Sequence, residues 1–313
     1  MTLALLCSGQ GSQHSEMFGL TGNSPEANDL FAHAKTLLHG RDPRNIVRTE
    51  NSNFLHHDRV GQILCVLQAL AAAAALRQRL PDRLIVTGYS VGEVAAWGVA
   101  GFLDALDVLD LVAHRADAMD AVSPPGDGML FVRGLSREII DSLCATYGAA
   151  VAIVNPGEAF VLGGSRVSLN ALADAAKAAD AIRVADIEVE VASHTKRLAP
   201  ASAIFRGALQ GIAPEVHISP KIRLLSGIDA TPVMSVNIGM EKLAAQISNT
   251  VRWSDCLQAC VEGGATAFLE LGPGSALSRM VIGAYSNVAA RALDEFRTLD
   301  GVATWVEKLA SRG

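Results

Sequence analysis

Residues 83–101 read RLIVTGYSVGEVAAWGVAG, and this stretch decides the fold. An apolar, β-branched run leads into a Gly-x-Ser-x-Gly turn, and an alanine-rich helical segment follows the turn. A serine on a sharp turn between a strand and a helix is the nucleophile elbow of α/β-hydrolase sheets. Gly88 and Gly92 fit that turn because the strand and the helix crowd together there. The stretch therefore predicts an α/β fold with Ser90 as the nucleophile, at the positive N-terminal end of the next helix.

The composition indicates a globular protein without a surface for nucleic acid. Half of the 313 residues are hydrophobic and 19% are charged, so the chain can bury a large core. The net charge is -6, and no block of Lys and Arg is longer than a pair. The longest uncharged apolar run, residues 63–76, is shorter than the roughly 20 residues that span a bilayer. It predicts a buried helix, and we expect neither nucleic acid nor a membrane as a partner.

Residues 1–7 lack the basic segment of a signal peptide, so a cytoplasmic location is expected. The five cysteines form no Cys-x-x-Cys pair, which argues against a disulfide framework and against a zinc site. His56 and His57, followed by Asp58, could suggest metal binding, but neighbouring side chains do not face the same way. We interpret residues 56–58 as a solvated loop and expect no bound metal.

Strand-like and helical runs alternate over the first 120 residues, which is typical of α/β proteins. The densest cluster of Gly and Pro, residues 123–128, marks a boundary. Residues 127–191 then follow a β-α-β-β-α-β order, the ferredoxin-like pattern of a small two-layer subdomain. We therefore expect an α/β-hydrolase-like domain with a mostly parallel sheet from residues 1–126 and 192–313, and a ferredoxin-like insertion at 127–191.

The same patterns give the extent of each element. The strands are expected at residues 3–7, 84–87, 129–132, 150–154, 159–162, 182–187, 222–226, 265–271 and 288–292. The helices are expected at residues 26–38, 60–79, 91–100, 105–119, 136–147, 167–179, 196–209, 240–248, 253–262, 275–283 and 299–311.

A serine hydroxyl needs a base within hydrogen-bond reach before it can act as a nucleophile. His194 directly follows the insertion, where the chain re-enters the larger domain, and clefts between domains are common places for sites. It also follows Ser90 in the chain, as the histidine does in hydrolase-type sheets. His194 is therefore the predicted base, and His114 is the runner-up.

A glycine loop, SGQGSQ at residues 8–13, follows the first strand and would lie at the carboxyl edge of the sheet, where ligands bind. A dinucleotide fingerprint would need a third glycine where the chain has His14, so a Rossmann site is disfavoured. An oxyanion hole shared between this loop and the N–H of Val91 fits the elbow better.

Five motifs occur in the order and approximate spacing of the malonyl-CoA:acyl carrier protein transacylases, which the chain resembles over nearly its whole length. They are GQGSQ at 9–13, GYSVGE at 88–93, HR at 114–115, SH at 193–194 and LGPG at 271–274. The continuation of the elbow as VAAWGVAG, residues 94–101, resembles the malonate decarboxylase epsilon subunit.

The resemblance implies transfer of malonyl from malonyl-CoA to the thiol of an acyl carrier protein. In that reaction Ser90 would bear the acyl group, His194 would be its base, and the N–H groups of Gln10 and Val91 would form the oxyanion hole. No cofactor bound by the chain is implied, since the acceptor carries its own phosphopantetheine-type arm. For the epsilon-subunit branch, the acceptor would be the carrier subunit of malonate decarboxylase with its modified dephospho-CoA arm.

Three further residues take roles from the resemblance. Arg115 would bind the free carboxylate of the malonyl group, as a guanidinium can do with two parallel hydrogen bonds. Asn155 matches a position on the substrate side of the small subdomain. Gln246 matches the residue whose backbone carbonyl orients the histidine in place of an aspartate.

Some positions depart from the family pattern. Ser8 replaces a proline, Tyr89 replaces a histidine beside the nucleophile, and residues 191–193 read Val-Ala-Ser, which leaves the acyl selectivity open. Three alternatives remain beside the decarboxylase role: a malonyl transacylase of fatty acid or polyketide synthesis, a serine thioesterase or esterase that passes the acyl group to water, and a scaffold without activity. The intact Ser90, His194 and Arg115 argue against the scaffold.

Overall fold

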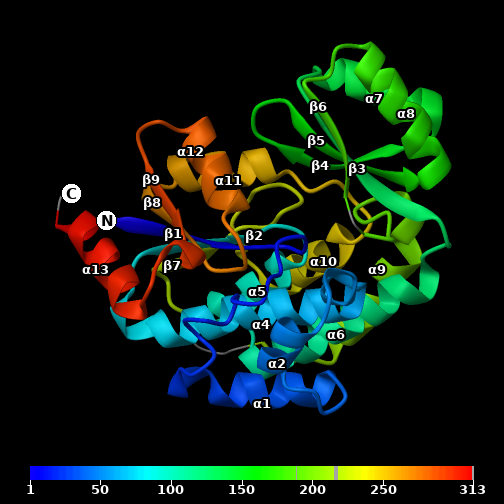
Figure 1. Cartoon of the computed structure of the whole chain (residues 1–313). Coiled ribbons are helices and arrows are strands. Elements are labelled where there is room, and N and C mark those ends of the chain that lie inside the picture. Colours follow the sequence, from blue (N-terminus) through cyan, green and yellow to red (C-terminus); the bar gives the residue numbers. More distant parts are fainter. Residues whose placement is uncertain (188, 215–217, 312–313) are drawn as a thin grey trace.

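The computed structural model describes residues 1–187, 189–214 and 218–311, which form two sheets with helices around them (Figure 1). The larger sheet has the strand order β7-β2-β1-β8-β9, and all its pairings are parallel. Its strands are β1 (Thr2–Cys7), β2 (Leu84–Gly88), β7 (Ile222–Leu224), β8 (Ala265–Glu270) and β9 (Ala289–Ala292). The predicted α/β fold with a mostly parallel sheet is confirmed.

Helices cover both faces of this sheet, which explains why its central strands are apolar throughout. Alternate residues of β1 point to opposite faces, so Leu3 and Leu5 join the core beneath α4, α5 and α6, while Ala4 and Leu6 join the core beneath α11 and α12 (Figure 1). These helices are α4 (Asp58–Leu76), α5 (Gly92–Val99), α6 (Ala105–Val122), α11 (Trp253–Glu262) and α12 (Ala276–Ala284).

Four further helices of the large unit lie around this core. They are α1 (Asn28–Leu37), α9 (Ala199–Gln210), α10 (Val236–Gln246) and α13 (Leu299–Ala310). The segment Asp58–Arg79 is long and apolar enough to cross a membrane, but 72% of its most apolar window is buried inside the fold. It packs against α5 and α6 as a core helix, as the sequence predicts for residues 63–76.

The small sheet is antiparallel with the order β4-β5-β3-β6, which is the ferredoxin-like arrangement. Its α7 and α8 pack on one face, and the other face meets the large unit, where Ile153 and Val161 share a core with Trp253. The division of the chain into a large domain and an inserted domain at residues 127–191 stays a prediction. The elements are β3 (Asp127–Arg133), α7 (Arg137–Tyr147), β4 (Ala150–Asn155), β5 (Ala159–Ser165), α8 (Arg166–Ala178) and β6 (Arg183–Ile187).

Residues 56–58 are not a loop, and that interpretation is wrong. His56 ends the short helix α3 (Ser52–His56), and Asp58 begins α4. The helix α2 (Pro43–Thr49) was not predicted either. Such short helices carry too few residues for a hydrophobic period. α2 does have local start signals, because the Asp42 side chain caps its N-terminus and Pro43 is its first residue. The first two residues of α4, Asp58 and Arg59, were missed because they are polar.

Several other helices differ from their predicted bounds, and α10 and α9 differ most at their starts. α10 begins at Val236, four residues before the predicted start, and the predicted helix 196–209 opens with a 3-10 turn over Lys196–Leu198 before α9. Lys196–Leu198 form a 3-10 turn, which is more tightly wound than an α-helix. The turn leads directly into α9, so only a short connection separates the small unit from that helix.

Candidate active site

The elbow has the backbone geometry that the sequence predicts. Ser90 has a φ of 55°, which is uncommon for a residue with a side chain. A Cβ at Gly88 would lie 2.1 Å from the carbonyl carbon of Gly92, and a Cβ at Gly92 would lie 2.1 Å from the carbonyl oxygen of Cys7. Both glycines are therefore required by the close approach of β1, β2 and α5. The N-terminus of α5 begins two residues after Ser90 and points toward it.

His194 lies directly against the predicted nucleophile. Its Nε2 is 2.7 Å from Ser90 Oγ, and its Nδ1 is 2.7 Å from the backbone oxygen of Gln246. A carbonyl oxygen only accepts, so Nδ1 carries the proton and the lone pair of Nε2 faces the hydroxyl. His194 also has a φ of 61°, so both members of the pair are held in a strained backbone conformation.

The charge state of His194 suits a base. Burial, and then the nearby charge of Arg115, lower the pKa of its imidazole to about 3. The ring is therefore neutral at physiological pH, with Nε2 free to accept a proton. His114, the runner-up, is exposed on α6, and no hydrogen bond joins it to Ser90.

The side chain of Gln246 connects the elbow to the histidine. Its Nε2 donates to Glu93 Oε2 at 2.6 Å and to the backbone oxygen of Ser90 at 3.0 Å. Glu93 also accepts from the N–H of Gly227 at 3.1 Å, and burial raises the pKa of its carboxyl to about 7. Sequence reasoning gave Glu93 no role, although an acid in an alanine-rich apolar helix segment was a signal.

The glycine loop packs directly on the elbow. A Cβ at Gly9 would lie 2.8 Å from the carbonyl oxygen of Tyr89. Gln13 Oε1 accepts from the N–H groups of Gly11 and Ser12, at 2.6 and 3.0 Å, and this closes the loop on itself. Within the described residues, no such bond engages the N–H of Gln10 or Val91, the two donors predicted for the oxyanion hole.

Arg115 is buried in α6, with 1% of its surface exposed. Its Nη1 donates to Gln62 Oε1 at 2.5 Å, whereas Nη2 is buried and has no partner among the described residues. Burial lowers the pKa of the guanidinium to about 10, against the charges of Asp58 and Glu93. A buried cation with a spare donor fits a carboxylate ligand. Gln62 was missed by sequence reasoning, since a glutamine within an apolar helix carries no distinctive motif.

Asn155 ends β4 on the side that faces the elbow. Its side chain lies beside the Tyr89 hydroxyl, yet neither of its polar atoms forms a hydrogen bond of normal geometry with a described residue. Tyr89 packs edge-on against Trp253, with ring centroids 5.3 Å apart. Asn155 therefore keeps unsatisfied donor and acceptor groups although it is 4% exposed.

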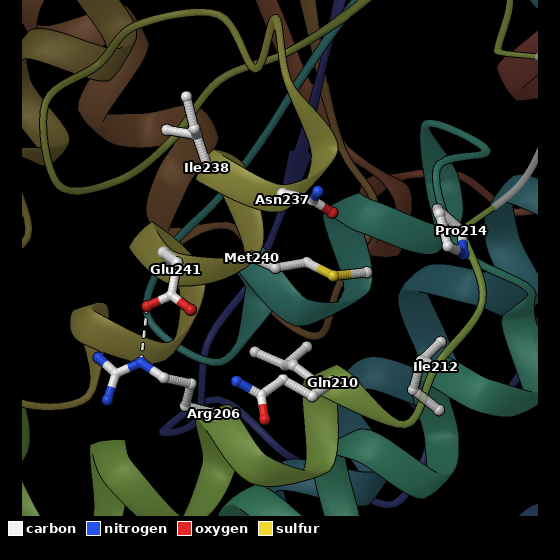
Figure 2. Close-up of a pocket in the computed structure, with 9 residues that line it drawn as sticks. Arg206, Gln210, Ile212, Pro214, Asn237, Ile238, Met240 and Glu241 are labelled. Atoms are coloured by element: carbon white, nitrogen blue, oxygen red, sulfur yellow. Dashed lines mark hydrogen bonds and ion pairs between the residues drawn. The ribbon is translucent and has the colours of Figure 1, made fainter.

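Two hollows differ in their relation to this cluster. The larger, of about 1010 Å³, lies where the two units meet and is lined by residues of both, among them Asp58, Arg166 and Val191. The smaller, of about 400 Å³, lies between α9 and α10, where Arg206 pairs with Glu241 (Figure 2). None of the predicted site residues lines either hollow. The larger one reaches Val191, three residues before His194, and Asp58 at the start of α4, so it is the candidate access route.

The sequence profile of the acyl transferase domain matches residues 4–299. The chain belongs to the acyl transferase family. This acyltransferase is 32% identical over 305 residues to a malonyl CoA-acyl carrier protein transacylase of Mycobacterium tuberculosis. The alignment covers 96% of the acyltransferase and 99% of the relative.

Solved structures agree with this assignment. The crystal structure of a malonyl transacylase from Mycobacterium tuberculosis matches with a TM-score of 0.88 and 31% identity, over 97% of this acyltransferase and all of that chain (100%). A malonyl-transacylase solved in complex with a type II polyketide synthase acyl-carrier protein matches with a TM-score of 0.89 and 26% identity, over 98% of the acyltransferase and 100% of that chain.

Proposed function

We propose that the acyltransferase moves a malonyl group from malonyl-CoA to the thiol of an acyl carrier protein through an ester on Ser90. Ser90 Oγ attacks the thioester carbonyl while His194 Nε2 takes its proton, and the C–S bond then breaks as the proton passes to the leaving sulfur. In the second half, the carrier thiol attacks the ester, His194 takes the thiol proton, and the C–O bond breaks as the proton returns to Ser90. The kinetics are ping-pong.

The observation that carries this proposal is the buried guanidinium of Arg115 beside the Ser90–His194 pair. Its charge lowers the pKa of His194, and its Nη2 has no partner among the described residues. An acetyl group would leave this donor unsatisfied, whereas a malonyl carboxylate would satisfy both the charge and the donor. The arrangement therefore favours an acyl group that ends in a carboxylate.

The remaining predicted residues receive roles under the same proposal. The N–H groups of Gln10 and Val91 stabilise the oxyanion of each tetrahedral intermediate, at about 2.7–4 kcal/mol for a donor of this kind. Asn155 binds the acyl thioester from the side of the small unit. Gln246 holds the tautomer of His194 through its backbone carbonyl. The larger hollow admits the arm of CoA or of the carrier, and the chain acts in the cytoplasm without a bound cofactor.

The named relatives support an acyl carrier protein of fatty acid or polyketide synthesis as the acceptor. The transacylase that matches in complex with a polyketide carrier protein covers nearly the whole chain, which supports docking of a carrier of that class. The carrier subunit of malonate decarboxylase is the second candidate acceptor. Tyr89 favours it, because the tyrosine packed on Trp253 replaces the usual histidine of the transacylase elbow.

Intact-protein mass spectrometry after mixing with malonyl-CoA tests the reaction. We expect a stoichiometric malonyl adduct that Ser90→Ala abolishes, and an adduct on Ser90→Ala would overturn the mechanism. Arg115→Ala should lose malonyl transfer and keep or improve acetyl transfer, whereas equal losses would remove Arg115 from the clamp. Arg206→Ala, beside the hollow of Figure 2, is the matched control for loss of an arginine.

Two comparisons separate the alternatives. Release of free malonate faster than acylation of any carrier would indicate a thioesterase or esterase. Transfer rates to an acyl carrier protein of fatty acid synthesis and to the malonate decarboxylase carrier subunit, measured side by side, decide between the two acceptors. We expect the first carrier to be the better acceptor, and a clear preference for the second would assign the decarboxylase role.

A further inference from the structure

We infer that Asp58 is a positioning residue for the carboxylate clamp. Through Gln62 it aims the guanidinium of Arg115, and it thereby sets the preference of the enzyme for acyl groups that carry a carboxylate. The inference rests on the proposed function, since it concerns the same arginine.

Three side chains form a relay from the first turn of α4 to α6. Asp58 Oδ2 accepts from Gln62 Nε2 at 2.7 Å, and Gln62 Oε1 accepts from Arg115 Nη1 at 2.5 Å. Asp58 and Gln62 are four residues apart on one helix, so their side chains lie on the same face. Gln62 has 0% of its surface exposed, so water does not compete for its amide.

The relay leaves the amide of Gln62 only one orientation. A carboxylate only accepts and a guanidinium only donates, so the amide must turn its NH₂ to Asp58 and its oxygen to Arg115. Without the carboxylate of Asp58, the amide could rotate and present its own donors to the guanidinium. Arg115 would then lose its hydrogen-bond acceptor, and the orientation of its Nη2 would no longer be fixed.

The side-chain amide of Gln62 acts as a spacer between Asp58 and Arg115, and it leaves the arginine available for the substrate carboxylate. A carboxylate in direct contact with Arg115 could take two N–H groups of the guanidinium at once and compete with the substrate. Gln62 instead uses Nη1 alone, and Nη2 has no partner among residues 1–187, 189–214 and 218–311. The charge of Asp58 still acts at a distance, where it opposes the loss of the proton from the buried Arg115.

The same turn of α4 also contacts the glycine loop. Gln10 Nε2 donates to the backbone oxygen of Asp58 at 3.3 Å. A Cβ at Gly61 would lie 2.7 Å from Gln10 Nε2 and 2.6 Å from Gln13 Nε2, so glycine is what lets the loop approach the helix. Asp58 therefore connects the loop of the predicted oxyanion hole to the clamp, and both sets of contacts depend on this turn.

Rates of malonyl and acetyl transfer by three variants test the inference. Asp58→Ala should lower kcat/KM for malonyl-CoA about tenfold, the value of roughly one hydrogen bond to a charged group, and change that for acetyl-CoA less than about twofold. Asp58→Asn, which can still accept from Gln62 Nε2, should restore most of the malonyl rate. Asp117→Ala removes a carboxylate of α6 that is 56% exposed and pairs with Arg59, and it is the matched control.

Equal losses for the two substrates in Asp58→Ala, or no rescue by Asp58→Asn, would overturn the inference. Gln62→Glu gives a second readout if the alanine variant does not fold. It should abolish malonyl selectivity while acetyl transfer continues, and persistent malonyl selectivity would overturn the role of the spacer. A failure of the proposed function is distinct, because Arg115→Ala would then lower malonyl and acetyl transfer equally in a chain whose Asp58 is intact.

Discussion

The carboxylate of Glu93 lies 2.6 Å from the side-chain amide of Gln246, the residue whose backbone oxygen holds the proton of His194. Glu93 is three residues after Ser90 on the elbow itself. The contacts therefore form a closed ring from the serine through the histidine and the glutamine back to the elbow. A hydrolase triad places its acid directly on the histidine. Here the acid is one amide further away, so its charge does not raise the pKa of the imidazole.

Glu93 is predicted to position the base. Glu93→Ala leaves the amide of Gln246 and the N–H of Gly227 without their acceptor, at a cost of about 1–3 kcal/mol. We expect kcat to fall roughly tenfold or more with KM nearly unchanged, because the loss is in the orientation of His194. Glu93→Gln keeps an acceptor oxygen and should retain most of the rate. Steady-state kinetics and urea unfolding check this, and a loss of stability without a change in kcat would contradict it.

His194 is predicted to stay active as a base in mild acid, since its pKa is lowered to about 3. With an ordinary pKa near 6.5, kcat/KM would fall about tenfold by pH 5.5. We expect less than a twofold fall between pH 7.5 and 5.5 for acetyl-CoA, whose acyl group has no carboxylate. Glu93 titrates in the same range, so Glu93→Gln is measured in parallel. A tenfold fall in both proteins would contradict the lowered pKa.

Glu270 is predicted to make the fold less stable as the pH rises. It accepts from the Ser8 hydroxyl at 2.8 Å and from the N–H of Ser278 at 2.8 Å, and burial raises its pKa from 4.5 to about 7. Between these two values the folded chain keeps a proton that the unfolded chain releases, so the free energy of unfolding falls, by on the order of 3 kcal/mol.

The lowered pKa of His194 changes the stability with pH in the opposite direction, so the wild type alone does not report on Glu270. The difference between Glu270→Gln and the wild type does, because both proteins contain His194. Stability from His194 is present above pH 6.5 and is lost as the pH falls toward 3. We expect the free energy of unfolding of the variant, measured with urea, to rise relative to that of the wild type as the pH increases from 4.5 to 7. Glu241→Gln, at an exposed ion pair, is the control. A difference that does not change with pH would refute the prediction.

Gly61→Ala is predicted to separate stability from activity. Alanine in place of glycine within a helix gains about 1 kcal/mol, but its Cβ would displace the amides of Gln10 and Gln13. The lost hydrogen bonds cost about 0.5–1.5 kcal/mol each, so we expect a small net change in stability. kcat should fall, since Gln10 carries a predicted oxyanion donor. Full activity in a folded variant would contradict the role of this contact.

The sequence predicted the parts of the fold and site that depend on local chemistry. The Gly-x-Ser-x-Gly elbow, the apolar parallel strands and the β-α-β-β-α-β order each follow from residues close together in the chain. His194 was found from its place after the insertion, and the contact with Ser90 agrees with it. Short polar helices such as α3 were missed because they offer no period to detect.

The sequence by itself therefore determined the fold class and the motif residues of an acyltransferase. Only the tertiary structure joined Asp58 to Arg115 through Gln62, and Glu93 to His194 through Gln246. Each relay crosses between helices that are 50 or more residues apart, and a buried acid or amide has no periodicity of its own. The physical reason is that a polar group in the core must find its partner across the packed interior, so its function is decided by packing and not by spacing along the chain.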